Sequence, residues 1–393
     1  MPIKININPS LFWLLSFFTF CIVLIYPPFV FFQFVNEIAR IIFFAFILII
    51  LFIYQISCPI KRSRIYNILF LWSCILIYFI SSVIINGKEG ARTSIGYAFI
   101  LVFAIILFSI FQLEKKNYLF KYIFNIYTIF FLIVPVFCIC NFLLNLITPS
   151  LNFLTPYFSN FTYNYLASPF GLLIPKSILG VNFSRNFFFF IEPVYLSLFY
   201  LINVIIVGKY TPSYSRLFIN LNIFGGLLTA SYFFFLGYAI LKFINMNYLK
   251  KAIIILLTIF ISFFFNNFII NFFSESSSDD RLSRLEIGLE IIKNYNFKNL
   301  FFGTGYLFDH EINKGVSSGF FTSFIEGGII GLLIPFVIAI FLCQKNKQLI
   351  VIVCLSLLLF EPYKMPFFWY TIALVGNLNN TLNNKTNFYK NYE

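Results

Sequence analysis

Two arginines three residues apart are the strongest candidates for chemistry in this chain. Arg281 and Arg284 lie in the charged segment 279–284, and on a helix they share a face with Gly288. A guanidinium binds phosphate through two parallel charge-assisted hydrogen bonds, so two of them on one face indicate an anion site that a glycine leaves room to approach. Asp280 joins them as a candidate for substrate binding. A surface helix with an Asp280–Arg284 ion pair explains the same spacing equally well.

Two further residues are candidates for a general base. Glu192 lies in an apolar stretch, about two turns into the expected sixth membrane span, where an ionisable side chain is costly. His310 is the only histidine of the chain and has acidic residues on both sides. Either side chain can take a proton, and the pattern does not choose between them. Arg185, just before the sixth span, is a third candidate cation. The structural alternatives are an ion pair or helix end at Glu192 and a solvated His310.

The elements that must position these residues are membrane helices. Of 393 residues, 60% are hydrophobic and 10% charged, and apolar runs of nearly twenty residues recur along the chain. A bilayer core takes about 20 helical residues to cross, so the composition predicts an all-α polytopic integral membrane protein in a single membrane domain, residues 1–393. We expect about twelve spans, at 11–34, 38–57, 66–85, 93–112, 122–147, 187–207, 217–230, 232–246, 252–270, 319–342, 348–361 and 365–380.

The distribution of charge predicts the orientation of these spans. Lys and Arg are concentrated in alternate short connections, which the positive-inside rule assigns to the cytoplasm together with both termini. Most of the net charge of +13 is therefore a topology signal and not a nucleic-acid-binding surface. Two long extracytoplasmic loops remain, at 148–185 and 271–318. The second contains a short amphipathic helix near 280–294. Pro27-Pro28 is expected to kink or break the first span.

No cofactor or metal is predicted. The seven cysteines fall within apolar spans or on the predicted cytoplasmic side, and neither long loop contains one. Cys138 and Cys140 are close in sequence but have no partner His or carboxylate nearby, so they are expected to be small buried hydrophobes.

Several short segments together resemble a known family. They are Arg185 with Glu192-Pro193, Leu228-Thr229-Ala230-Ser231, Asp280-Arg281-Leu282, Gly288-Leu289-Glu290-Ile291-Ile292, Leu300-Phe301-Phe302-Gly303-Thr304-Gly305-Tyr306, Ser317-Ser318-Gly319-Phe320 and Glu326-Gly-Gly-Ile-Ile-Gly331. Their order and their placement, over about residues 180 to 335, resemble the O-antigen and capsular repeat-unit polymerases of bacterial envelopes (Wzy-like). That superfamily also contains the O-antigen ligases.

The resemblance implies glycosyl transfer at the outer face of the bacterial plasma (inner) membrane. The substrate would be an oligosaccharide repeat unit linked to undecaprenyl diphosphate, delivered through the lipid bilayer. A polysaccharide polymerase would join these units into O-antigen of lipopolysaccharide or into capsule. Arg281, Arg284 and Arg185 would then bind the diphosphate, and Glu192 or His310 would act as the base. A flippase and a co-polymerase that sets chain length are the partners that the resemblance implies.

Two alternatives remain open. The ligase branch joins finished glycan to the lipid A core, but it usually carries a His-Asn pair where this chain has Ser318-Gly319, which favours the polymerase branch. A transporter such as a flippase for the lipid-linked oligosaccharide needs charges within a central cavity and usually shows two related halves. Here the charges gather in the two loops instead.

Overall fold

The fold was analysed in a computed structural model of the chain. It describes residues 9–26, 29, 35–57, 62–112, 118–147, 166–168, 171–178, 181–186, 188–190, 192–210, 215–251, 253–254, 279–303, 319–344, 346–360 and 362–383. Most of the expected ninth span, His310, and residues 271–278 and 304–318 of the second long loop lie outside these residues.

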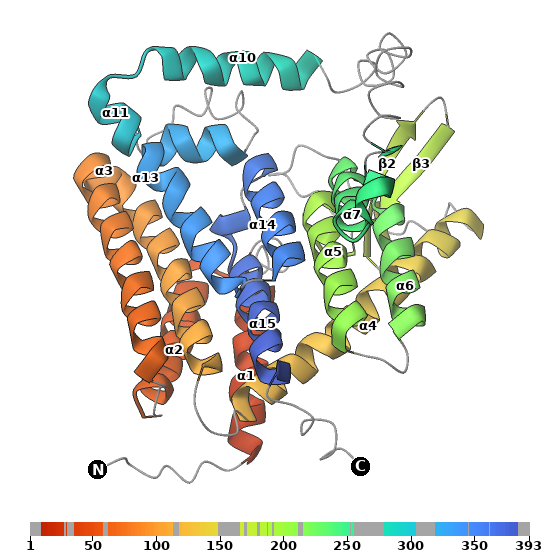
Figure 1. The fold of residues 1–393 in the computed structure, drawn as a ribbon, viewed down its shortest axis with the longest axis horizontal. Helices are drawn as coiled ribbons and strands as arrows, with labels where there is room; N and C mark the ends of the chain where they lie inside the picture. Colours follow the sequence, from red (N-terminus) through yellow and green to blue (C-terminus); the bar gives the residue numbers. More distant parts are fainter. Residues whose placement is uncertain are drawn as a thin grey trace.

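Helices make up most of the described chain (Figure 1). They are α1 (Pro9–Leu24), α2 (Glu37–Ser57), α3 (Arg62–Phe111), α4 (Tyr118–Ile147), α5 (Pro193–Tyr210), α6 (Ser215–Leu228), α7 (Tyr232–Ile244), α10 (Asp279–Lys293), α11 (Phe297–Phe302), α13 (Gly319–Leu342), α14 (Lys347–Leu359) and α15 (Pro366–Asn383), with a 3₁₀ turn η4 (Pro362–Lys364). α1 ends just before the Pro27-Pro28 pair. Within the described residues, three helical segments are long and apolar enough to cross a bilayer: Glu37–Ser57, Leu119–Leu144 and Phe320–Leu342. A helical membrane protein is thus confirmed, and the number of twelve spans stays a prediction.

α3 covers two of the expected spans in one element. If its 50 residues were a straight helix, Phe70 and Gln112 would lie roughly 63 Å apart. Instead the rings of Phe70 and Phe341 lie 5.6 Å apart, and Gln112 donates a hydrogen bond to Asn377 close by. Residues 341–342 and 376–377 are themselves in contact, so both ends of α3 lie together. The ribbon of α3 doubles back on itself (Figure 1).

The helices have two common ends. α7 and α14 run antiparallel, because the ring of Phe233 lies 5.0 Å from that of Phe360 while Gln348 donates a hydrogen bond to Asn245 at 2.9 Å. We call the end that carries Phe233, Phe360 and α10 the loop end. The terminal end is the one that carries Asn245, Gln348 and the last turn of α15. Figure 1 shows α10 and the strands at one end, and the last turn of α15 with the first of α1 toward the other.

The first long loop contains a small antiparallel sheet that the sequence did not lead us to expect. Its strands are β1 (Leu166–Ser168), β2 (Gly171–Ile178) and β3 (Val181–Asn186), in the order β1-β2-β3. Pro175 lies opposite Ser184 in the centre of this sheet. A proline cannot donate to a strand ladder, and a central strand containing one is easily mistaken for irregular loop.

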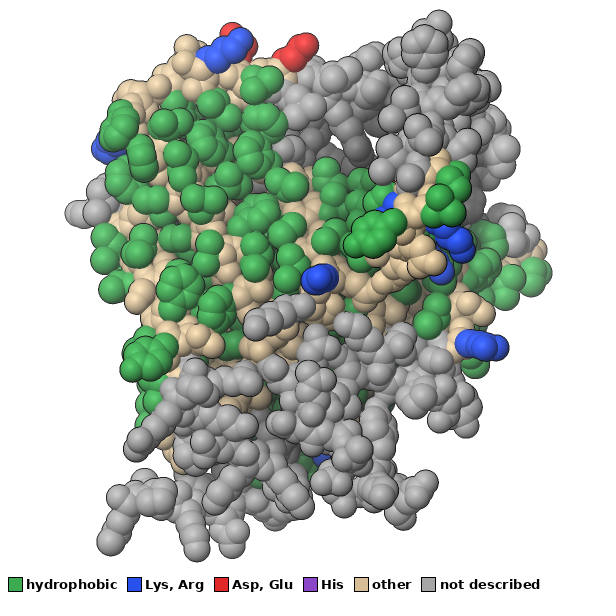
Figure 2. All heavy atoms as spheres, in the orientation of Figure 1, with side chains coloured by type: hydrophobic (Ala, Val, Ile, Leu, Met, Phe, Trp, Pro, Cys, Tyr) green, Lys and Arg blue, Asp and Glu red, His purple; other side chains and the backbone are tan. Residues whose placement is uncertain are grey.

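Aromatic rings fill the centre of the helical body. Phe29 meets Phe190 through an isolated bridge, and their rings lie 4.5 Å apart. Phe367 and Phe199 close the cluster, and all four side chains are buried. Apolar side chains also cover the outside of the helices, whereas the red acidic side chains on this face lie at the α10 end (Figure 2). An apolar exterior is what a lipid-facing surface requires.

Candidate functional site

Glu192 lies at the start of α5 and not two turns inside it, so that part of the prediction is wrong. The helix begins at Pro193, and Glu192 forms a bend immediately before it. The residue before a proline is pushed out of helical geometry, whereas proline itself is favoured at the first helical position. Glu192 is half-buried at the loop end. Its carboxyl group therefore lies outside the apolar helix and not within it.

The Thr229 turn packs directly beside this helix start. Ser197 Oγ donates to the carbonyl of Pro193 at 2.7 Å and lies 2.9 Å from Thr229 Oγ1. Thr229 Oγ1 in turn donates to the Gly226 carbonyl, in the last turn of α6, at 2.6 Å. Ala230 has a φ of 45°, a left-handed conformation that reverses the chain into α7. The structure thus brings Glu192-Pro193 and Leu228–Ser231 together.

A ring contact joins this region to the turn between α14 and α15. Phe360 lies edge-on to Tyr195 at 5.4 Å and to Phe233 at 5.0 Å. The chain then enters η4, which ends at Lys364. Lys364 is consequently held at the same end of the molecule as Glu192.

Lys364 forms a largely buried ion pair with Glu326 of α13. Its Nζ lies 2.8 Å from Glu326 Oε1, and the two side chains are 16% and 6% exposed. The ammonium also lies 5.4 Å from the ring centroid of Tyr97 on α3, in cation–π geometry. Removing either charge would leave the other desolvated, so this pair fixes η4 against α13 and α3.

Two glycines interlock just beside this ion pair. Gly303, with a φ of 74°, lies so close to α13 that a Cβ there would overlap the carbonyl of Glu326. Gly328, with a φ of 60°, kinks α13, and a Cβ there would overlap the backbone of Phe301. Only glycine accepts both the positive φ and the backbone-to-backbone approach. The Gly303 segment and the Glu326-Gly-Gly segment, far apart in the sequence, thus form one contact.

α10 lies on the start of α13 through its glycine. Gly288 is buried, and a Cβ there would lie 3.1 Å from Phe321. The space beside Gly288 is filled by Phe321, so the expectation that this glycine leaves room for a headgroup is wrong. Tyr295, just after α10, donates from its hydroxyl to the Ile325 carbonyl at 3.1 Å and stacks on Phe324. These contacts seat the α10–α11 segment next to the kink.

The predicted cations lie on the elements that cover the loop end. Asp280, Arg281 and Arg284 belong to the first two turns of α10, which matches the predicted helix 280–294 closely. Arg185 lies on β3, opposite Ile174 of β2. Figure 1 shows α10 across the same end as the sheet, with α11 at the other end of α10 from these residues. His310 lies outside the described residues.

Sequence reasoning missed the functional interest of Glu326 and Lys364. The sequence offers Glu326 only as part of a segment that carries the resemblance, and it does not single out Lys364. A signal was present, because the predicted topology puts Lys364 on the side from which the positive-inside rule depletes cations. Such a lysine needs a carboxylate partner, and few acidic residues lie on apolar helices of this chain.

Among the described residues, no group of three or more His, Cys, Asp or Glu side chains is placed to hold a metal ion. The sequence matches no protein-family model and no curated protein, and the structure matches no solved structure.

Proposed function

We propose that the chain is a polysaccharide polymerase of the bacterial plasma (inner) membrane. It would join undecaprenyl-diphosphate-linked repeat units into O-antigen or capsular polysaccharide at the outer face. The observation that supports this most is the gathering of separated segments at one end: the Thr229 turn beside Glu192, and Gly303 against Glu326. These are segments on which the resemblance to repeat-unit polymerases rests.

In this proposal the loop end faces away from the cytoplasm. Twelve spans with both termini cytoplasmic would place α10 and the sheet at the outer leaflet, where a lipid-linked donor presents its diphosphate. Arg281 and Arg284 would bind the diphosphate, with Arg185 as a third cation and Asp280 as a polar contact to the substrate. Guanidinium groups suit this role because the leaving group gains negative charge as it departs.

The reaction is a glycosyl transfer. A hydroxyl oxygen on the terminal sugar of the acceptor repeat unit attacks the anomeric carbon of the donor glycan. The bond from that carbon to the phosphate oxygen breaks, and undecaprenyl diphosphate leaves with the electron pair. The proton of the hydroxyl passes to Glu192 or His310 as general base. Glu192 is suited to this because it lies in a bend outside the helix and is half-buried.

The Glu326–Lys364 pair has a supporting part. It lies beside the interlocked glycines, where Gly303 at the end of α11 packs against α13, and α10 precedes α11 in the chain. A site that must orient two glycans needs its cations on a rigid support. We therefore assign the pair to positioning and not to proton transfer.

The test is deletion of the gene, with the envelope glycans resolved on a gel. A single repeat unit on the lipid core or cell surface supports the polymerase. Full-length polymer retained on undecaprenyl diphosphate would identify a ligase instead. Absence of any repeat unit at the outer leaflet would identify a flippase. A flippase and a chain-length-setting co-polymerase are the proposed partners, and co-purification with either would extend the assignment.

A further inference from the structure

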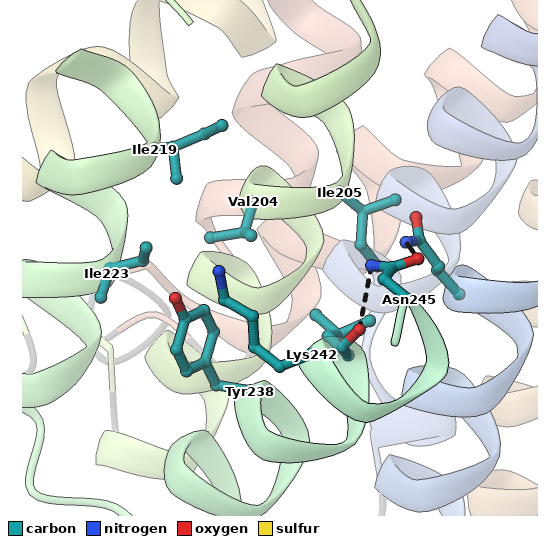
Figure 3. A pocket seen from close by; sticks show the side chains of 9 residues that line it. Val204, Ile205, Ile219, Ile223, Tyr238, Lys242 and Asn245 are labelled. Atoms are coloured by element: carbon teal, nitrogen blue, oxygen red, sulfur yellow. Dashed lines mark hydrogen bonds between the residues drawn. The ribbon is translucent and has the colours of Figure 1, made fainter. Parts of the chain in front are cut away.

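A second site lies at the terminal end, remote from the proposed polymerase site. A cavity of about 300 Å³ opens between α5, α6, α7 and the start of α14 (Figure 3). This volume is at the lower end of the roughly 300–1,000 Å³ typical of ligand pockets. Its walls come mainly from branched apolar side chains, including Val204, Ile219 and Ile223.

One cation enters this apolar cavity. Lys242 of α7 extends alongside the ring of Tyr238, with its ammonium directed toward Val204 and Ile223 (Figure 3). Its Nζ lies 5.4 Å from the centroid of the Tyr238 ring. No carboxylate is among the described residues that line the cavity. The Lys242 side chain is exposed at the mouth of the cavity, and with no carboxylate among the described lining residues its ammonium attracts an anionic ligand.

The rim of the cavity is polar and fixed. Gln348 donates from Nε2 to Asn245 Oδ1 at 2.9 Å, and Asn245 donates from Nδ2 to the Leu241 carbonyl at 3.0 Å. These bonds tie the end of α7 to the start of α14. The two amides give the otherwise apolar cavity a polar edge.

Two more cations and an exposed tyrosine follow α7 in the chain. Lys250 and Lys251 follow α7 at the same end, and Lys251 lies 5.5 Å from the ring centroid of Tyr248. Tyr248 and Leu249 are 91% and 75% exposed, as expected for side chains that rest in a membrane interface. Basic pockets between membrane helices, bordered by interfacial aromatic rings, favour anionic phospholipids.

We propose that this cavity binds one anionic phospholipid from the leaflet at the terminal end. One acyl chain lies against Val204, Ile219 and Ile223, and the phosphate pairs with Lys242. The phosphate and the apolar wall are both needed, which distinguishes this ligand from free phosphate and from a zwitterionic lipid. The site does not depend on the proposed polymerase activity, since it lies at the opposite end of the helices.

The test is native mass spectrometry of the full chain purified in detergent and titrated with phosphatidylglycerol or phosphatidylcholine. We expect the wild type to retain one phosphatidylglycerol, roughly fivefold more than phosphatidylcholine. Lys242→Gln should lose this preference, whereas Lys250→Gln, exposed at the same end but not lining the cavity, should keep it. Ile223→Trp should prevent binding of either lipid by filling the cavity.

Equal retention of both lipids by the wild type would overturn the proposal, as would an unchanged preference in Lys242→Gln. Displacement of phosphatidylglycerol by inorganic phosphate would also overturn it, because the ligand would then be the free anion. If Ile223→Trp does not fold, Lys242→Gln still decides, since Lys242 has an exposed side chain and the protein does not need it for its core.

Discussion

The ammonium of Lys364 lies 2.8 Å from the carboxylate of Glu326, and the pair joins the turn before α15 to the kink of α13. Both side chains are mostly shielded from solvent, so the charge of each is stabilised mainly by the opposite charge of the other. This relationship, together with the neighbouring glycine contact, makes the loop end a connected structure and not a set of independent loops.

Lys364→Met should strongly destabilise the protein. It leaves the Glu326 carboxylate buried without its cation, which costs roughly 3–5 kcal/mol in comparable buried pairs. The loss of stability can be measured as a lower melting temperature in detergent. The double variant Glu326→Gln with Lys364→Met should recover much of the loss, since no charge is left unpaired. If the double variant were as unstable as the single one, the pair would not be the source of the effect.

Gly303→Ala should lose both stability and glycan ladder, while Gly327→Ala serves as the matched control. At Gly303 the positive φ costs roughly 1–2 kcal/mol for an L-residue, and the Cβ overlaps the carbonyl of Glu326. At Gly327, an added Cβ meets nothing within 4 Å. Fluorescence-detected size-exclusion chromatography and the envelope glycan gel report the two effects. Equal behaviour of the two variants would argue against the interlocked glycines.

Asn222→Ala should destabilise the helical body, and Asn220→Ala on the same helix should not. Asn222 Oδ1 accepts from Asn203 Nδ2 at 3.0 Å, and Asn203 Oδ1 accepts from the Tyr127 hydroxyl at 3.0 Å. Removing the Asn222 amide leaves the buried Nδ2 donor of Asn203 unsatisfied, at a cost of about 1–3 kcal/mol. Asn220 is exposed. Thermal unfolding compares them, and similar melting temperatures would show that the chain of amides contributes little.

Tyr295→Phe should lower the thermal stability of the protein only slightly. The variant loses the hydrogen bond from the hydroxyl to the Ile325 carbonyl, worth about 0.5–1.5 kcal/mol, and keeps the stacking on Phe324. Tyr295→Ala, which removes both, should reduce the glycan ladder because α10 loses part of its seat on α13. A ladder unchanged in Tyr295→Ala would mean that α10 does not need this contact.

The sequence was sufficient where one local pattern decided the structure. The apolar runs placed α2 and α13 within a residue of their observed bounds, and the predicted helix at 280–294 matches α10 equally well. Glu192 was misplaced although the rule that a proline excludes helix at the preceding residue was available.

Long-range contacts could not be predicted in this way. The residues around Gly303 in the sequence do not indicate that it packs against the carbonyl of Glu326. Likewise, the residues around Lys364 do not indicate that it forms an ion pair with Glu326. The sheet was hidden for a different reason, because Pro175 in its central strand is typical of loops. The roles of Arg185, Arg281 and Arg284 stay predictions, since they rest on helix spacing and on the resemblance.

Reconstitution tests the central claim most directly. The purified chain, in liposomes, would be given undecaprenyl-diphosphate-linked repeat units extracted from a strain lacking this gene, and the products resolved on a gel. We expect a ladder of polymer with one undecaprenyl diphosphate released for each bond formed. Arg281→Ala should give none, while Lys293→Ala, an exposed cation in the last turn of the same helix, should retain the ladder. Correctly folded wild-type protein that leaves the repeat units unjoined would contradict the polymerase assignment.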